Sequence, residues 1–188
     1  MSVSRNQDRQ APNPAQGTAD RYQAIHQGFG WKVPKRFNMA QACCGQWAAK
    51  PATARRIAIR EHVAGQGLGR SWTFGQLQKA ANQLSQVLQA QGVQRGDRVA
   101  IVLPQRFETA VAYMAVLQMG AVAMPLSILF GPDALEFRLQ DSEAVLAICD
   151  ESSIDNLLSV RGNCPQLGQV LGVGAAAAQA DLDYAQAL

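Results

Sequence analysis

A chain of 188 residues, 48% of them hydrophobic, is long enough to fold as one domain with a sizeable core. Its formal net charge of +3 is not gathered into a block of Lys or Arg, which argues against a nucleic-acid partner. No apolar run reaches the ~20 residues needed to cross a bilayer, and the first residues lack the apolar centre of a secretory signal. We therefore predict a cytoplasmic protein that binds neither nucleic acid nor membrane.

The cysteines give no sign of a metal centre. They contain no Cys-x-x-Cys pair, and only two histidines are available to join them. A zinc site is therefore not expected. We interpret all four as structural thiols in a reducing compartment: Cys43, Cys44, Cys149 and Cys164.

Residues 1–19 are rich in Gln, Asn, Pro, Ala and Ser. Such a segment cannot bury enough surface to offset the entropy of ordering it, so we predict a disordered N-terminal segment over residues 1–19. We expect residues 20–188 to form one α/β subdomain. Near its start, "FNMAQACCGQWAAK" predicts a helical arm that lays Met39, Cys43 and Trp47 on one face and packs on the main body.

The stretch "RIAIREHVAGQGLGRSWTF" is typical of a small β-hairpin, because Ile57 and Ile59 alternate with polar residues before a Gly-rich segment. We interpret Gly65, Gly67 and Gly69 as turn glycines. A phosphate-binding loop would need a helix directly after them, and a strand comes next instead.

The segment after the hairpin has clear signals for the start and the end of a helix. Thr73 and Gln76 have the spacing of a capping box, and Trp72 and Leu77 that of a hydrophobic staple. The expected buried stripe recurs at helical spacing, and Gly92 stands where a helix ends with positive φ. The stripe consists of Leu77, Ala81, Leu84 and Leu88.

From Arg98 onward, apolar strands alternate with helices: "RVAIVLP", "AVAMPLS", "AVLAIC" and "GQVLGV" are separated by helical segments. Uninterrupted apolar strands joined through helices predict an α/β fold, with a parallel sheet flanked by helices on both faces and right-handed crossovers. In such a sheet, ligands bind outside the carboxyl ends of the strands.

Local motifs give little further chemistry. Arg95-Gly96-Asp97 is interpreted as a turn between a helix and a strand. Gly172, Gly174 and Ala177 fit the G-x-G-x-x-A dinucleotide pattern, but an ordinary exit loop is favoured because no following strand supplies its acidic residue about 20 positions on. No nucleophile motif is present, and spacing alone does not decide whether carboxylates such as Glu108 and Asp133 form a pair.

Three motifs together resemble the N-terminal subdomain of the AMP-forming acyl-CoA synthetases, in the adenylate-forming superfamily. They are Thr73-Phe74 with Leu77, Gly96-Asp97 with Val99, and Gly120-Ala121 with Pro125. The resemblance covers about residues 37 to 173, and "FNMAQACCGQWAAKP" with "LFGPDALEFRL" is similar to the acetyl-CoA and medium-chain acyl-CoA synthetase branch.

The resemblance implies a ligase that uses ATP, Mg²⁺ and CoA. A carboxylic acid would attack the α-phosphate of ATP to give an acyl adenylate and pyrophosphate, and the CoA thiol would then displace AMP. The family's ATP loop ending in Pro-Lys-Gly, and its later Thr-Glu pair, Asp and Lys, do not occur in this sequence. We therefore expect the chain to be an incomplete N-terminal piece that has no ligase activity alone and binds none of ATP, Mg²⁺ and CoA tightly. We also expect it to self-associate through apolar surface that the rest of the enzyme would cover.

No catalytic residue and no metal ligand is assigned. The resemblance places the loop Ser127–Gly131 near the CoA and acyl tunnel, so Leu129 and Phe130 are interpreted as lining that passage, with capping of the core as the alternative. A different class of protein, a stand-alone α/β module that binds a nucleotide or a partner, also stays open. Continuation of the reading frame past Leu188 into a Ser/Thr/Gly-rich loop would distinguish the two.

Overall fold

The computed structural model describes residues 14–32 and 34–188. By their contacts, the residues divide into two units, Met1–Arg36 and Phe37–Leu188. In the first unit, helix α1 spans Pro14–Gly28, so residues 14–19 of the segment predicted to be disordered are helical. Residues 1–13 lie outside the described residues, and a boundary between residues 19 and 20 stays a prediction.

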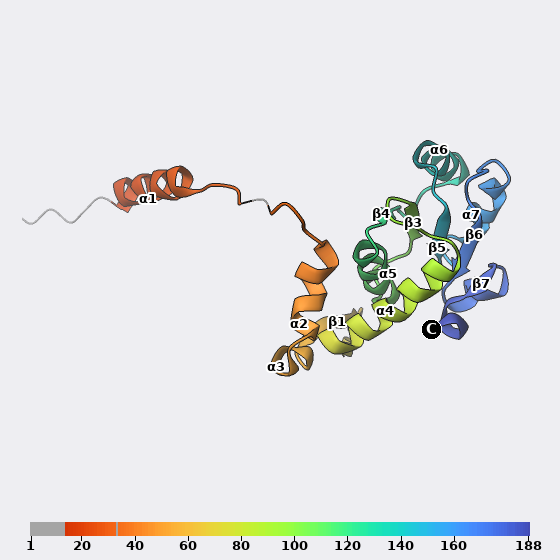
Figure 1. Cartoon of the computed structure of the whole chain (residues 1–188), viewed down its shortest axis with the longest axis horizontal. Helices are drawn as coiled ribbons and strands as arrows, with labels where there is room; N and C mark the ends of the chain where they lie inside the picture. Colours follow the sequence, from red (N-terminus) through yellow and green to blue (C-terminus); the bar gives the residue numbers. More distant parts are fainter. Residues whose placement is uncertain (1–13, 33) are drawn as a thin grey trace, which may run out of the picture. The chain divides into compact units, whose positions relative to one another are not determined.

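The second unit is built on a parallel sheet, as the alternating pattern predicts (Figure 1). Within the described residues its strand order is β4-β3-β5-β6-β7, and every neighbouring pair is parallel. The strands are β3 (Arg98–Val102), β4 (Val122–Pro125), β5 (Leu146–Cys149), β6 (Gln169–Gly172) and β7 (Leu182–Asp183).

Helices cover both faces of this sheet, which confirms the predicted fold class. One layer contains α4 (Phe74–Ala90) and α5 (Phe107–Gln118), and the other contains α6 (Pro132–Ser142) and α7 (Ile154–Arg161). Successive strand residues alternate between the two layers: Val99 and Ile101 pack under α4 and α5, whereas Ala100 and Val102 pack under α6 and α7. Apart from the first residues Arg98 of β3 and Gln169 of β6, the central strands have no polar side chain because neither face meets water.

The capping box at the start of α4 is confirmed. The Gln76 amide donates to Thr73 Oγ1 at 3.2 Å, and the Thr73 amide donates to Gln76 Oε1 at 2.8 Å. The predicted stripe is buried in full, and Gly92 comes after the helix with φ of 87°. Local sequence therefore fixes both ends of this helix.

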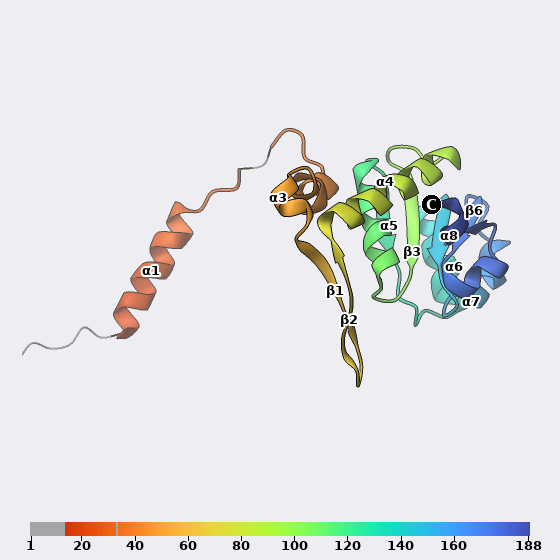
Figure 2. The ribbon, with the colours of Figure 1, turned by 90° about the horizontal axis from the view of Figure 1, so that it is seen from below.

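The hairpin is also confirmed, with β1 (Ile57–Val63) antiparallel to β2 (Gly67–Thr73); Figure 2 shows it as a thin projecting ribbon. Gly65 and Gly67 have φ of 75° and 82°, as turn glycines should. Gly69 is not a turn residue: it lies within β2, where a Cβ would meet the Glu61 carboxylate at 2.7 Å.

The helical arm presents a different face from the one predicted. It consists of a π-helical turn, Gln41–Gly45, then α2 (Gln46–Ala48) and α3 (Pro51–Ala54). Met39, Cys43 and Trp47 are exposed, whereas Ala40 and Cys44 are buried, so the prediction was displaced by one residue. The arm packs on the body: Cys44 Sγ lies 3.8 Å from the Phe74 carbonyl, and the Trp47 ring, although 39% exposed, stacks on the Phe74 ring with centroids 6.0 Å apart.

The chain ends in short elements that the sequence did not predict. After β6, a 3₁₀ turn spans Gly174–Ala178, and β7 leads into helix α8 (Tyr184–Ala187). Across the described residues, no helix is both long enough and apolar enough to pass through a membrane.

Candidate functional site

The strand order places a topological switch point between β3 and β5. From β3, one connection leads outward to β4, and the next crosses back to β5 and continues to β6 and β7. The loops after β3 and β5 therefore diverge and leave a crevice at the carboxyl edge of the sheet, where open α/β sheets bind their ligands. We call the side of the sheet at which the strands end the carboxyl edge, and the side at which they begin the amino edge.

A cavity of about 430 Å³ lies at the carboxyl ends of β3 and β4. Its walls come from the loop after β3, the loop after β4 and the first turns of α5, and they are mainly apolar with a few polar atoms, as is usual for small-molecule sites. The lining residues include Leu103, Gln105, Thr109, Tyr113, Ser127 and Ile128.

A charged cluster joins the segments after β3 and β5. Arg106 Nε lies 2.7 Å from Glu108 Oε2, and Arg106 Nη1 lies 3.2 Å from Asp150 Oδ2. Burial lowers the pKa of the Arg106 guanidinium, but the hydrogen bonds and charges of Glu108 and Asp150 outweigh it and raise that pKa. Burial, together with the nearby Glu108 carboxylate, raises the pKa of the Tyr184 hydroxyl. At ordinary pH the Arg106 guanidinium is therefore ionised and the Tyr184 hydroxyl is neutral.

A second cavity, of about 310 Å³, separates this cluster from the hairpin. The Trp72 ring stacks on the Phe107 ring, with centroids 4.6 Å apart and planes 7° from parallel. On the hairpin, the Arg70 guanidinium lies 5.6 Å from the centre of the Trp72 ring. Aromatic and charged side chains from the hairpin and from α5 thus meet beside the switch point.

The two residues predicted to line a passage do not behave alike. Leu129 is 88% exposed, so it does not cap the core. Phe130 is half-buried against the core under α6 and α7, and the Arg138 guanidinium lies 4.1 Å from its ring centre. The wall of the larger cavity includes the preceding residues Ser127 and Ile128. A passage lined by Leu129 and Phe130 therefore stays a prediction.

The glycine pattern after β6 has an explanation in chain geometry. A Cβ on Gly172 would lie 2.7 Å from backbone atoms of Ala176 and Ala177, so a tight turn excludes any larger residue there. Gly174 has φ of 66°. It begins a five-residue 3₁₀ turn, and the expected exit loop accounts for Gly172, Gly174 and Ala177.

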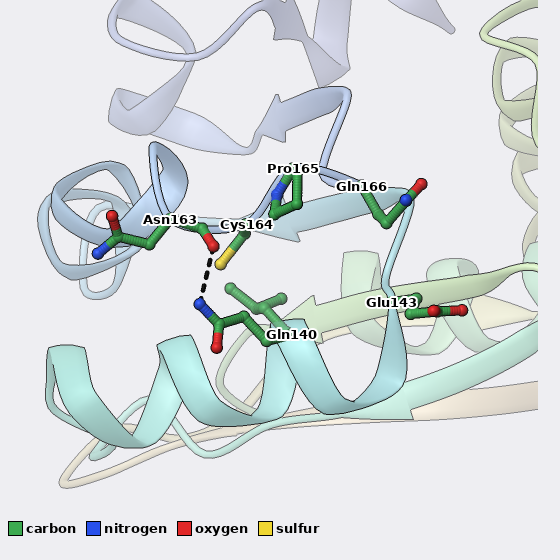
Figure 3. Close-up of a pocket in the computed structure, with 7 residues that line it drawn as sticks. Gln140, Glu143, Asn163, Cys164, Pro165 and Gln166 are labelled. Carbon is green, nitrogen blue, oxygen red and sulfur yellow. Dashed lines mark hydrogen bonds between the residues drawn. The ribbon is translucent and has the colours of Figure 1, made fainter.

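A cavity also exists at the opposite, amino edge of the sheet. It measures about 350 Å³ and lies between the end of α6 and the segment before β6 (Figure 3). Gln140 Nε2 donates to the Asn163 carbonyl at 2.8 Å, and Cys164 lines the wall next to Pro165. This edge precedes the strands, so it is not where a parallel sheet presents a ligand.

The cysteines are free thiols in the structure, with Cys43 exposed and the others buried. Burial raises the pKa of Cys44 to about 11 and that of Cys149 to about 12, which keeps both thiols protonated and unreactive. Among the described residues, no three His, Cys, Asp or Glu side chains are placed to hold a metal ion.

Sequence reasoning missed Arg106 and Asp150, the residues that join the two strands at the switch point. Asp150 comes directly after the apolar strand "LAIC", and Arg106 comes soon after "RVAIVLP". Carboxyl ends of adjacent parallel strands meet at one edge, so this placement was the signal that could have found them.

A model described as "AMP-binding enzyme" matches residues 45–187. The chain belongs to this family. It is 33% identical over 156 residues to acyl-coenzyme A synthetase ACSM4, mitochondrial, of Rattus norvegicus, a match that covers 80% of this chain and 26% of the relative. It is 32% identical over 139 residues to acyl-coenzyme A synthetase ACSM2A, mitochondrial, of Homo sapiens, covering 72% of this chain and 24% of the relative.

Solved structures agree with the sequence matches. An acyl-CoA synthetase from Brucella canis superposes with a TM-score of 0.71 at 26% identity, over 93% of this chain and 31% of that one. The anthranilate CoA ligase AuaEII, solved in complex with anthranoyl-AMP, superposes with a TM-score of 0.68 at 22% identity, over 82% of this chain and 27% of that one, and so supports the fold alone.

The predicted resemblance to AMP-forming acyl-CoA synthetases is therefore confirmed. The chain spans about a quarter of the length of these curated relatives. Because their names place them in mitochondria, a cytoplasmic location for this chain stays a prediction.

Proposed function

We propose that this chain is the N-terminal part of a ligase that activates a carboxylic acid with ATP and transfers the acyl group to CoA. The family match over residues 45–187 is the observation that carries the proposal. In the first step the acid attacks the α-phosphate of ATP, which forms an acyl adenylate and releases pyrophosphate. In the second step the CoA thiol attacks the acyl carbon and AMP leaves.

We infer that the chain contributes a wall of the substrate site and does not supply the groups that bind the triphosphate. A Gly-rich loop ending in Pro-Lys-Gly does not occur in its 188 residues, and holding the phosphates in position carries most of the rate in such chemistry. The cavity at the ends of β3 and β4 is the part of this chain best placed to meet the acid or CoA, with Leu129 and Phe130 on the loop beside it.

The test compares the 188-residue chain with the product of its whole reading frame. Each is given ATP, Mg²⁺, CoA and a series of carboxylic acids, and pyrophosphate release is measured. We expect acid-dependent release from the product of the whole reading frame and none above a boiled control from the 188-residue chain. No acid-dependent release from the former would contradict the ligase, and release by the 188-residue chain would contradict its inactivity.

A further proposal concerns the surface of the isolated chain. Exposed apolar side chains lie on the hairpin, on the edge strand β4, on the loop after β4 and on α6, and they favour self-association once nothing covers them. These side chains are Leu68, Val122, Leu129 and Phe137. Sedimentation of the 188-residue chain at increasing concentration should show species larger than a monomer. A clean monomer that binds no hydrophobic dye would count against this proposal.

A further inference from the structure

We propose that Arg106 is a positioning residue of the carboxyl edge. Its side chain fixes the loop 103–106, which forms a wall of the cavity at the ends of β3 and β4. The effect expected on substrate affinity rests on the proposed ligase function, whereas the effect on the loop rests on the geometry of this chain alone.

Two side chains tie the end of β3 to the segment after β5. Ser153 Oγ donates to the Val102 carbonyl at 2.8 Å, which holds the last residue of the strand. Arg106 acts further along, because its guanidinium reaches Asp150 from the far end of the loop. The residues between these anchors, Leu103 to Gln105, line the cavity. The Pro104 carbonyl also accepts a hydrogen bond from Thr109 Oγ1, so Arg106 and Thr109 together set the position of the wall.

The Asp150 carboxylate is positioned to accept a hydrogen bond from Arg106. The residue is 2% exposed. Its Oδ1 atom accepts hydrogen bonds from the amide and the hydroxyl of Ser152 at 3.1 and 2.6 Å, which leaves Oδ2 for Arg106 at 3.2 Å. Leaving a buried carboxylate without its cationic partner destabilises the fold. We therefore expect the Arg106–Asp150 pair to restrain the loop 103–106.

Glu108 fixes the guanidinium from the other side. It lies in the first turn of α5, where a negative charge is favourable, and accepts from Arg106 Nε at 2.7 Å. Arg106 is thus held between its own helix and the neighbouring strand. The planar guanidinium donates to the Glu108 carboxylate from Nε and to the Asp150 carboxylate from Nη1. The single ammonium group of lysine lacks this fixed, forked arrangement of donors.

The amino edge offers a matched control. Arg161 Nη1 lies 2.8 Å from Asp181 Oδ2, and Arg161 Nη2 donates to the Gly168 carbonyl at 2.8 Å. Its side chain is 30% exposed, against 29% for Arg106. Removing Arg161 therefore breaks an Arg–Asp pair at the edge away from the cavity; its arginine is as exposed as Arg106, whereas the Asp181 side chain is 32% exposed against 3% for Asp150.

The first experiment measures KM, kcat and melting temperature in the product of the whole reading frame. Arg106→Gln should raise KM for the carboxylic acid or for CoA about tenfold, while Arg161→Gln changes KM by less than about twofold. Arg106→Lys, which keeps the charge, should show part of the effect and remains informative if Arg106→Gln does not fold. Equal KM for the Arg106 and Arg161 variants would overturn the substrate part of the proposal.

The second experiment measures amide hydrogen exchange in the 188-residue chain, so it does not depend on ligase activity. Arg106→Gln should speed exchange at the amides of Thr109 and Ser152, which donate to the Arg106 carbonyl at 3.2 Å and to Asp150 Oδ1 at 3.1 Å, and Arg161→Gln should leave them unchanged. If the wild-type protein has no ligase activity, the proposed function fails and this measurement alone decides the positioning role. Unchanged exchange in both Arg106 variants would overturn it.

Discussion

Each edge of the sheet carries an Arg–Asp pair, but the two pairs differ in burial and in the segments that they hold. At the amino edge, backbone bonds tie neighbouring turns directly: the Gly96 amide donates to the Gly120 carbonyl, and the Val145 amide donates to the Arg98 carbonyl, both at 3.0 Å. At the carboxyl edge, side chains such as Arg106 and Asp150 bridge segments that surround open cavities. The Arg106–Asp150 pair, with its buried aspartate, therefore holds the loops beside the cavity at the ends of β3 and β4, whereas the more exposed Arg161–Asp181 pair lies away from that cavity. Binding residues concentrate on loops that a rigid scaffold positions.

The largest effect should come from Gly172, where the carboxyl end of β6 meets the next turn. Gly172→Ala places a Cβ 2.7 Å from backbone atoms, so the free energy of unfolding should fall by about 3 kcal/mol. Gly168→Ala, before the amino end of the same strand, places a Cβ at an ordinary 3.7 Å from the Val145 carbonyl oxygen. Urea unfolding measures the free energy of unfolding of both variants. Equal losses would contradict the prediction, because they would show that the turn after β6 shifts to make room for the Cβ.

Substitution of Asp150 or Asp181 measures how much each Arg–Asp pair contributes to the free energy of unfolding. Asp150→Asn removes a charge that accepts hydrogen bonds from Ser152 and Arg106 in a buried site, and should cost about 2 kcal/mol. Asp181→Asn affects a pair that is about a third exposed on each side, and should cost less than about 1 kcal/mol. Denaturant midpoints measure both costs, and a larger loss for Asp181 would reverse the comparison.

A smaller effect concerns pH. Burial acts to raise the pKa of Asp181, but the hydrogen bonds from Arg161 and the Val170 amide prevail and lower it from its usual value of 3.8. Its stabilising contribution is therefore complete above the unfolded pKa and is lost as pH falls through the lower folded pKa. Unfolding curves of wild type and Asp181→Asn should converge as the pH is lowered below 3.8; a gap that widens there would contradict the sign.

The smallest change in stability is expected on the loop after β4. Leu129 is 88% exposed, so Leu129→Ala should change the free energy of unfolding by less than about 0.5 kcal/mol. Phe130→Ala removes a ring packed on the core and should cost more. Thermal melts check both, and an equal cost would mean that Leu129 is covered by a neighbour in solution.

The main elements could be predicted from the sequence because their signals are local. The Thr73 capping box, the stripe of α4 and the apolar strands each depend on residues close together in the chain. The buried face of the arm could not, because it depends on contacts with residues distant in the chain, such as that between Cys44 and the Phe74 carbonyl. Arg106 and Asp150 are 44 residues apart, and only the strand order brings them together.

The most direct test of the account asks which edge of the sheet meets the substrate. Amide exchange is measured on the product of the whole reading frame with and without a non-hydrolysable acyl-adenylate analogue. We expect protection at residues 103–107 and 127–131 on the carboxyl edge, and none at residues 139–143 and 163–166 on the amino edge. Protection confined to the amino edge, or no protection in either region with the analogue bound, would contradict the account.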